Sequence, residues 1–148
     1  QRSFGPMRAQ LVHGSNYFNL ANENIVSFAM IETKQAVENL DEILSVPNLT
    51  GVYIGPADMS SSYGLQPKFD VKEDPVFSNI KLIAKKAKEH GKIAGIHNAS
   101  TAYAKEMIKI GYKFVTILSD FRVMSSNAQE IVNEMKNKSN DSKNSSTY

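Results

Sequence analysis

The sequence contains no cysteine, which excludes a disulfide framework and any thiolate metal site. This absence is typical of a reducing compartment, so we expect a cytoplasmic location. No apolar run approaches the length of a membrane span, and no secretory signal is visible. The net charge is only +2, and no basic stripe is interleaved with aromatic residues. Nucleic acid and membranes are therefore not expected partners.

What the chain does have is 41% hydrophobic residues in 148, enough for one hydrophobic core. Four short apolar runs, each followed by a segment with helical spacing, predict strands over residues 25–32, 51–55, 92–97 and 113–120. Near-continuous apolar strands that alternate with helices predict an α/β fold with a parallel sheet. Four such units fit either an open doubly wound sheet or half of an eightfold barrel.

The composition changes near the C-terminus. Residues 137–148 are polar and lack apolar periodicity, which predicts a disordered tail after a domain of residues 1–136. The chain begins at Gln1 rather than at methionine. We therefore expect it to be the back part of a longer protein.

Two acidic residues follow the first two expected strands. Glu32 is the last residue of the first run. Asp58 lies three residues after Gly55, where the second run ends. Because ligands bind at the carboxyl ends of parallel strands, both side chains would enter the same mouth if their strands are neighbours. Two carboxylates repel each other unless a cation or a shared proton lies between them. Oxygen ligands suit Mg²⁺ or Mn²⁺, so the pattern suggests a divalent metal site.

Both residues have a structural alternative. Asp58 could cap a helix or form an Asx-turn. Glu32 could cap the helix that follows it, or it could be solvated beside a capping Thr33. The spacing of these residues leaves the alternatives open.

Three further polar residues are interpreted structurally. His90, just before Gly91, is expected to be a favourable charge at a helix C-terminus. His97 is expected to be a satisfied histidine that faces backbone carbonyls. Asp120 is expected to cap the last helix.

Two motifs, MIETKQAVENLDEILSV (30–46) and GVYIGPADMSSSYG (51–64), are followed by GKIAGIH and GYKFVTILSD. Together they resemble the metal-dependent pyruvate aldolases of the 2,4-dihydroxyhept-2-enedioate aldolase and citrate lyase β-chain superfamily. The opening RSFGPMRA is similar to the segment after the fourth barrel strand of that family, and the resemblance extends from Arg2 to about Met135. It implies that this chain is the second half of a TIM-type (β/α)₈ barrel, with about four βα units.

The resemblance also implies roles for individual residues. Glu32 and Asp58 match the family's two protein metal ligands, so Mg²⁺ or Mn²⁺ is the expected cofactor. Gly55, Ala57 and Asp58 match the segment that binds the carboxylate of pyruvate, through the backbone amides of Ala57 and Asp58. Met30 stands where many members have a substrate-contacting glutamine. The family's general-base histidine and pyruvate-orienting arginine come from the first half of the barrel, so no catalytic residue is assigned in this chain.

The implied activity is that of a lyase, a metal-dependent class II aldolase that reversibly cleaves a 4-hydroxy-2-oxo acid to pyruvate and an aldehyde. One alternative is a thioester-type lyase of the same superfamily, acting on malyl- or citramalyl-CoA or similar to the citrate lyase β-chain. Another is a catalytically incomplete fragment that only binds metal and a 2-oxo acid. Because a half barrel leaves open strand edges and an uncovered apolar face, we also expect a homo-oligomer.

Overall fold

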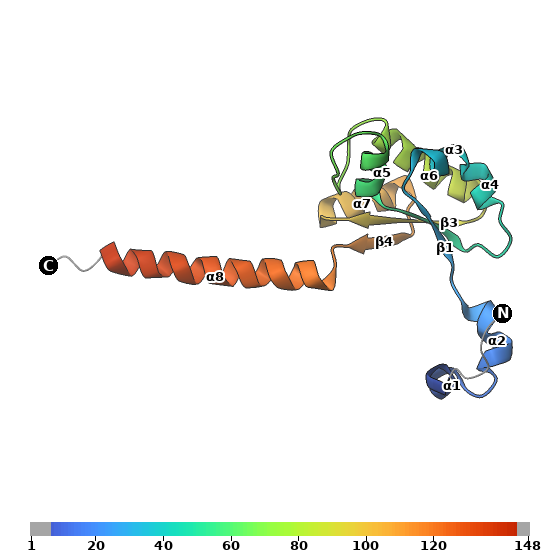
Figure 1. The fold of residues 1–148 in the computed structure, drawn as a ribbon, viewed down its shortest axis with the longest axis horizontal. Coiled ribbons are helices and arrows are strands. Elements are labelled where there is room, and N and C mark those ends of the chain that lie inside the picture. The colour runs from blue at the N-terminus through green and yellow to red at the C-terminus, as the bar shows by residue number, and fades with distance from the viewer. Residues whose placement is uncertain (1–6, 145–148) are drawn as a thin grey trace.

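The computed structural model describes the backbone of residues 7–144 and the side chains of residues 7–136. Two short helices, α1 and α2, precede four successive strand-helix units (Figure 1). The elements are α1 (Met7–His13), α2 (Tyr17–Asn24), β1 (Phe28–Ile31), α3 (Lys34–Glu38), α4 (Leu40–Leu44), β2 (Gly51–Ile54), α5 (Pro56–Ser62), α6 (Val76–Glu89), β3 (Ile93–Asn98), α7 (Thr101–Ile110), β4 (Phe114–Ile117) and α8 (Asp120–Asn144). None of the helices over the described residues is both long and apolar enough to cross a membrane.

The four strands form one parallel sheet in the order β1-β2-β3-β4, which is also their order along the chain. This confirms the predicted α/β fold with a parallel sheet. A doubly wound sheet reverses its strand order at a switch point, and these four strands show no reversal. Since parallel crossovers are right-handed, a sheet that grows in one direction has its helices on one side. Helices α3 to α7 do lie on one side of the sheet, and α8 runs away from it (Figure 1).

The hydrophobic core lies between the sheet and these helices. Five strand side chains on this face are at most 3% exposed: Ile31, Val52, Ile54, Ala94 and Ile96. They belong to one cluster with the buried face of α6, whose members recur at helical spacing: Val76, Ile80, Ile83, Ala84 and Ala87. Residues of β1, β2 and β3 on this face therefore point towards the helices.

The opposite face of the sheet is open. The parallel register brings Met30, Tyr53, Gly95 and Phe114 side by side. Met30 is 50% exposed and Phe114 45% exposed, so no helix of the described residues packs over this face. A Cβ atom on Gly95 would lie 2.7 Å from Tyr53 Cδ2 and 3.1 Å from Phe114 Cδ1. The missing side chain of Gly95 therefore makes room for the aromatic contact between Tyr53 and Phe114, whose ring centroids are 5.6 Å apart.

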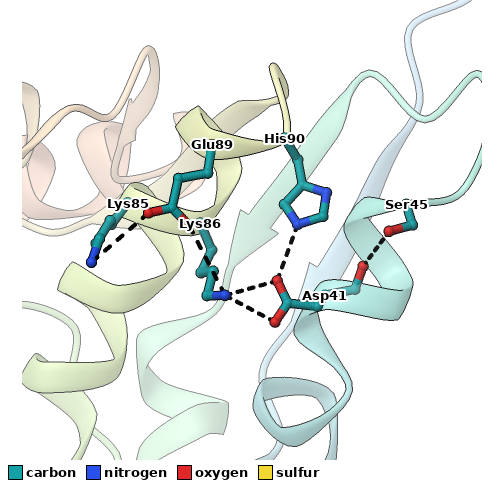
Figure 2. Close-up of polar contacts among 6 residues, drawn as sticks. All are labelled: Asp41, Ser45, Lys85, Lys86, Glu89 and His90. Atoms are coloured by element: carbon teal, nitrogen blue, oxygen red, sulfur yellow. Dashed lines mark hydrogen bonds and ion pairs between the residues drawn. The ribbon is translucent and has the colours of Figure 1, made fainter.

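A polar contact joins α4 to α6 (Figure 2). The Asp41 carboxylate accepts hydrogen bonds from Lys86 Nζ at 2.9 and 3.0 Å, and its Oδ1 lies 3.0 Å from His90 Nε2. The Lys86 ammonium and, second to it, His90 lower the pKa of Asp41 below its ordinary value of 3.8. His90 lies just after the last residue of α6, as predicted for a charge at a helix C-terminus. Its contact with Asp41 on another helix was not predicted.

The segment between α5 and α6, residues 63–75, packs against the end of β3 and against α7. Asp70 Oδ1 accepts a hydrogen bond from Ala99 N at 2.8 Å, and Tyr103 OH donates to the carbonyl of Val71 at 2.5 Å. Val71 itself is 2% exposed. These contacts fix the segment over the carboxyl ends of the strands.

Several predicted boundaries differ from the structure. Strands β1, β2 and β4 are shorter than the predicted runs, whereas β3 has the predicted length and lies one residue later in the chain. Helices α3 and α4 are separate and meet at Asn39. The prediction of disorder from residue 137 is wrong as far as residue 144, because α8 continues to Asn144. Helix-favouring residues such as Gln129, Glu130 and Met135 precede this stretch, and an established helix extends at low cost per residue. Residues 1–6 and 145–148 lie outside the described residues.

Candidate active site

The local structure shows how the ends of β1 and β2 are formed. Thr33 is the N-cap of α3, and its Oγ1 accepts a hydrogen bond from Ala36 N at 3.0 Å. Glu32 is therefore not the cap, and its side chain is half-buried between the strand and the helix. At the end of β2, Gly55 is the N-cap of α5 and makes no side-chain cap bond, so Asp58 is not the cap either. Asp58 lies in the first turn of α5 and is exposed.

The Glu32 and Asp58 carboxylates converge beside Gly55. Strands β1 and β2 are neighbours, with Ile31 opposite Ile54, so the residues that follow them leave the sheet side by side. An ideal Cβ on Gly55 would lie 3.0 Å from Glu32 Oε2 and 3.5 Å from Asp58 Oδ2. Both carboxylate oxygens therefore border the small space that a side chain at Gly55 would occupy.

The residues around this space fit a hard divalent cation. The donors are two carboxylates, and oxygen is the ligand atom that Mg²⁺ and Mn²⁺ prefer. Within the described residues, no group of three or more His, Cys, Asp or Glu side chains could hold a metal. A closed structural site is therefore not present there. A site with one or two carboxylates leaves coordination positions for water and substrate, which is how Mg²⁺ is commonly bound.

Two backbone amides at the start of α5 have no acceptor within the helix. The first donor within α5 is Met59 N, which bonds the Gly55 carbonyl at 2.9 Å. Pro56 has no N–H, and the amides of Ala57 and Asp58 precede Met59 in the first turn, so they lack an acceptor within the helix. Two N–H donors therefore lie beside the carboxylate pair.

A third group lies on the open face of the sheet, near the carboxyl end of β3. His97 Nδ1 is 3.0 Å from Thr116 Oγ1 and 3.5 Å from the hydroxyl of Tyr53. The Tyr53 hydroxyl in turn lies 2.5 Å from Thr116 Oγ1. His97 was predicted to face backbone carbonyls, but its partners are side-chain hydroxyl groups from the two neighbouring strands.

Two residues near His97 were not identified as site candidates from the sequence. The ring of Phe69, from the 63–75 segment, packs edge-on against His97 with the ring centroids 5.5 Å apart. Arg122 Cζ, from the first turn of α8, lies 5.2 Å from the centroid of Phe69. The only feature of the sequence that could have identified Arg122 was its position after the fourth predicted strand, at the carboxyl end of the sheet. Ser119 Oγ accepts from Arg122 N at 3.3 Å, so Ser119 caps α8 rather than the predicted Asp120, which is the first residue of the helix.

A cavity of about 530 Å³ lies at the amino ends of β3 and β4, away from these groups. Five lysines line it: Lys81, Lys85, Lys88, Lys92 and Lys113. Lysines close to the C-terminus of α6 have a structural role, because cations there interact favourably with the helix dipole. Lys92 also has a structural partner, since its Nζ donates to the carbonyl of Leu49 at 2.7 Å. The carboxyl ends of the strands are therefore the better candidate for an active site.

Comparison with known proteins gives one family. Residues 5–126 match the model described as HpcH/HpaI aldolase/citrate lyase. A hydroxypyruvate/pyruvate aldolase of Rhizorhabdus wittichii is 40% identical over 131 residues, which cover 88% of this chain and 52% of the relative. A 5-keto-4-deoxy-D-glucarate aldolase of Enterobacter sp. (strain 638) is 31% identical over 121 residues, covering 82% of this chain and 46% of the relative. The chain thus spans about half the length of the curated relatives that it matches.

Solved structures agree on the fold. A HpcH/HpaI aldolase/citrate lyase family protein from Burkholderia cenocepacia superimposes with a TM-score of 0.79 at 22% identity, over 92% of this chain and 52% of that protein. A citrate synthase, SbnG, gives a TM-score of 0.77 at 24% identity, over 94% of this chain and 53% of that protein. At these identities the likeness shows the fold alone. From the match of the family model and the 40% identical relative, the chain belongs to the HpcH/HpaI aldolase/citrate lyase family.

Proposed function

We propose that this chain provides the metal-binding half of a class II pyruvate aldolase, which reversibly cleaves a 4-hydroxy-2-oxo acid to pyruvate and an aldehyde. The observation that supports this most is the approach of Glu32 Oε2 and Asp58 Oδ2 to the same point beside Gly55. The aldolase names of two relatives support the reaction class. Glu32 and Asp58 would hold Mg²⁺ or Mn²⁺.

The residues of this chain then have separate tasks. The amides of Ala57 and Asp58 donate to the carboxylate of the 2-oxo acid, and Gly55 lets the substrate approach the backbone closely. A bound divalent ion supplies electron withdrawal from the 2-oxo group. Cleavage removes the proton of the 4-hydroxyl group, breaks the C3–C4 bond and leaves its electron pair on C3, which then takes up a proton to give pyruvate. The general base of the family matches no residue of this chain.

We further propose that the four strands are half of a (β/α)₈ barrel. The sequential strand order, the helices on a single side and the apolar open face support this architecture. The coverage of about half of each relative also supports it. In a closed barrel the open face would point inwards, and its aromatic and apolar side chains would fill the interior.

Titration calorimetry tests the metal site. We expect the 148-residue chain to bind Mn²⁺, and to bind pyruvate only when Mn²⁺ is present. Glu32→Ala and Asp58→Ala should each abolish Mn²⁺ binding, because one remaining carboxylate leaves too few protein ligands. Glu42→Ala is the matched control, since Glu42 is an exposed acidic residue on α4. Undiminished Mn²⁺ binding in either of the first two variants would refute the shared site.

A further inference from the structure

The cavity of about 530 Å³ at the amino ends of β3 and β4 lies away from the proposed metal site. Its walls come from α6, from the end of α7 and from the residues that enter β3 and β4. Glu32 and Asp58 instead follow the carboxyl ends of β1 and β2. A ligand in the cavity would therefore not compete with a substrate at the proposed metal site.

The charged side chains that line this cavity are all of one sign. Three lie on α6, one precedes β3 and one precedes β4: Lys81, Lys85, Lys88, Lys92 and Lys113. No acidic side chain of the described residues lines the cavity. Because residues three and four positions apart are neighbours on a helix, the three lysines of α6 form one row. Like charges at this spacing destabilise a helix, so an anion in the cavity would relieve their repulsion.

Three of the five lysines have a partner within the protein. Lys81 Nζ lies 4.0 Å from the centroid of the Phe77 ring, and Lys85 Nζ lies 3.8 Å from Glu89 Oε1. Lys92 donates to a backbone carbonyl, as described above. The structural partners of these three lysines do not extend to the other two.

Lys88 and Lys113 are exposed, and within residues 7–136 neither ammonium group has an ion pair or a hydrogen bond. The negative charge nearby is smaller than the positive charge. Glu89 contributes one charge, and the C-terminal ends of α6 and α7 contribute about half a charge each. An excess of about three positive charges remains at the cavity, and two of its cations are free to bind a ligand.

The cavity also offers open space and apolar surface. Gly91 and Gly111 line it at the turns that follow α6 and α7, with φ +66° and +124°. A Cβ added to either glycine would meet no atom within 4 Å, so both turns border open space. Ile93 and Ile110 are partly buried side chains of the same lining. The cavity therefore suits a ligand that combines negative charge with an apolar part.

We propose that this cavity binds an oligophosphate, an anion of two or more linked phosphate groups such as the triphosphate group of a nucleotide. The site is separate from the proposed catalytic one. The inference goes beyond the proposed function and does not depend on it, because no residue of the cavity belongs to the proposed metal site.

Two properties of the lysines favour linked phosphates. The row on α6 extends from Lys81 to Lys88, which is ~10 Å along the axis at about 1.5 Å per residue. An elongated anion contacts more of these cations at once than a single phosphate or carboxylate does. Lysine binds phosphate as a point charge, whereas arginine is the residue suited to paired recognition of a planar carboxylate. No arginine of the described residues lines the cavity.

Titration calorimetry tests the site in a buffer freed of divalent ions on a chelating resin, which removes any contribution of a bound metal. The probes are inorganic phosphate, pyrophosphate, triphosphate and ATP. We expect the affinity of the 148-residue chain to rise with each added phosphate, because each brings more negative charge near the lysines. Tighter binding of ATP than of triphosphate would place the nucleoside against the apolar surface. Tighter binding of triphosphate would assign recognition to the phosphate chain alone, and both outcomes support the site.

Variants distinguish the cavity from the charge of the whole protein. Lys88→Gln combined with Lys113→Gln should weaken triphosphate binding about tenfold, since each exposed ion pair is worth up to about fivefold in affinity. Lys105→Gln combined with Lys136→Gln is the matched control, because it removes the same charge from exposed positions on α7 and α8. Glutamine keeps the helix propensity of lysine, so both variants should fold. The control should bind triphosphate as tightly as the unchanged chain.

Acetylation of the lysines by an amine-reactive reagent, read by mass spectrometry, locates the ligand. Triphosphate should slow the acetylation of Lys88 and Lys113 and leave that of Lys105 and Lys136 unchanged. Glu32→Ala should lose Mn²⁺ binding but retain triphosphate binding, so the two proposals can fail independently. The site is refuted if the unchanged chain does not bind triphosphate, if both double variants weaken binding equally, or if all four lysines are protected alike.

Discussion

Gly55→Ala inserts one methyl group beside the Glu32 and Asp58 carboxylates. The new Cβ would lie 3.0 Å from Glu32 Oε2 and 3.5 Å from Asp58 Oδ2. The first distance is a few tenths of an ångström shorter than an ordinary contact between carbon and oxygen, so the Glu32 carboxylate must move. The second distance is an ordinary contact, so Asp58 can stay in place.

The expected effects on metal binding and on stability have opposite signs. Mg²⁺ requires near-octahedral geometry at roughly 2.0–2.1 Å, so a displaced carboxylate loses part of its interaction. We expect the metal affinity to fall about tenfold, or ~1.4 kcal/mol. The backbone at Gly55, with φ −99° and ψ 91°, is accessible to alanine. The free energy of unfolding without metal should therefore rise by about 0.4–1 kcal/mol, because alanine restricts the unfolded chain.

Calorimetry with Mn²⁺ and denaturant unfolding in a chelator measure the two effects separately. Gly91→Ala is the matched control, since Gly91 has φ +66° and no atom within 4 Å of an added Cβ. That variant should lose stability, because alanine is strained at positive φ, while its metal affinity stays unchanged. Undiminished metal affinity in Gly55→Ala would refute the placement of the metal between the two carboxylates.

Two further predictions concern the helices and the open face. The lowered pKa of Asp41 means that its contact with Lys86 and His90 adds to the free energy of unfolding above pH 3.8, and that this contribution is lost as the pH falls below that value. Thermal unfolding measured at pH 5 and at pH 3 tests this contact (Figure 2). Asp41→Asn should lose less stability between these two pH values than the unchanged chain, and equal losses would contradict the contact. The open sheet face should cause self-association at micromolar concentration, because burial of ~400 Å² of apolar surface is worth about 10 kcal/mol before association costs. Sedimentation should show oligomers that Phe114→Lys shifts towards monomer, and a single monomeric species that unfolds cooperatively would contradict this.

The elements of the sheet were predictable because their signals are local. Near-continuous apolar runs that end at Glu32, Gly55 and His97 predicted parallel strands, and the strands lie there. The motifs around Glu32 and Asp58 also predicted that the two carboxylates approach each other, since neighbouring parallel strands end at the same edge. The ends of α7 carry local signals of the same kind: Ser100 Oγ accepts from Tyr103 N at 3.2 Å, and Gly111 follows the helix at φ 124°.

The rest depended on contacts between distant segments. Phe69 lies in a polar stretch without periodicity, and its position follows from hydrogen bonds at Asp70 and Val71 that no local pattern reveals. The partners of His97 come from β2 and β4, so its sequence neighbours gave no information about them. The extent of α8 was underestimated because polar composition was taken as disorder, although a polar helix can continue once it has been nucleated.

The sequential strand order also determines the order in which the chain can assemble. Strands β1 and β2 are joined through two short helices, and β3 and β4 through α7 alone, whereas β2 and β3 are separated by α5, residues 63–75 and α6. Loop-closure entropy rises with the length of the connection, and contacts of longer range form more slowly. Two strand pairs can therefore form first and join through β2 and β3 afterwards. Glu32 and Asp58 follow the strands of the first pair, so their approach does not require the two pairs to have joined.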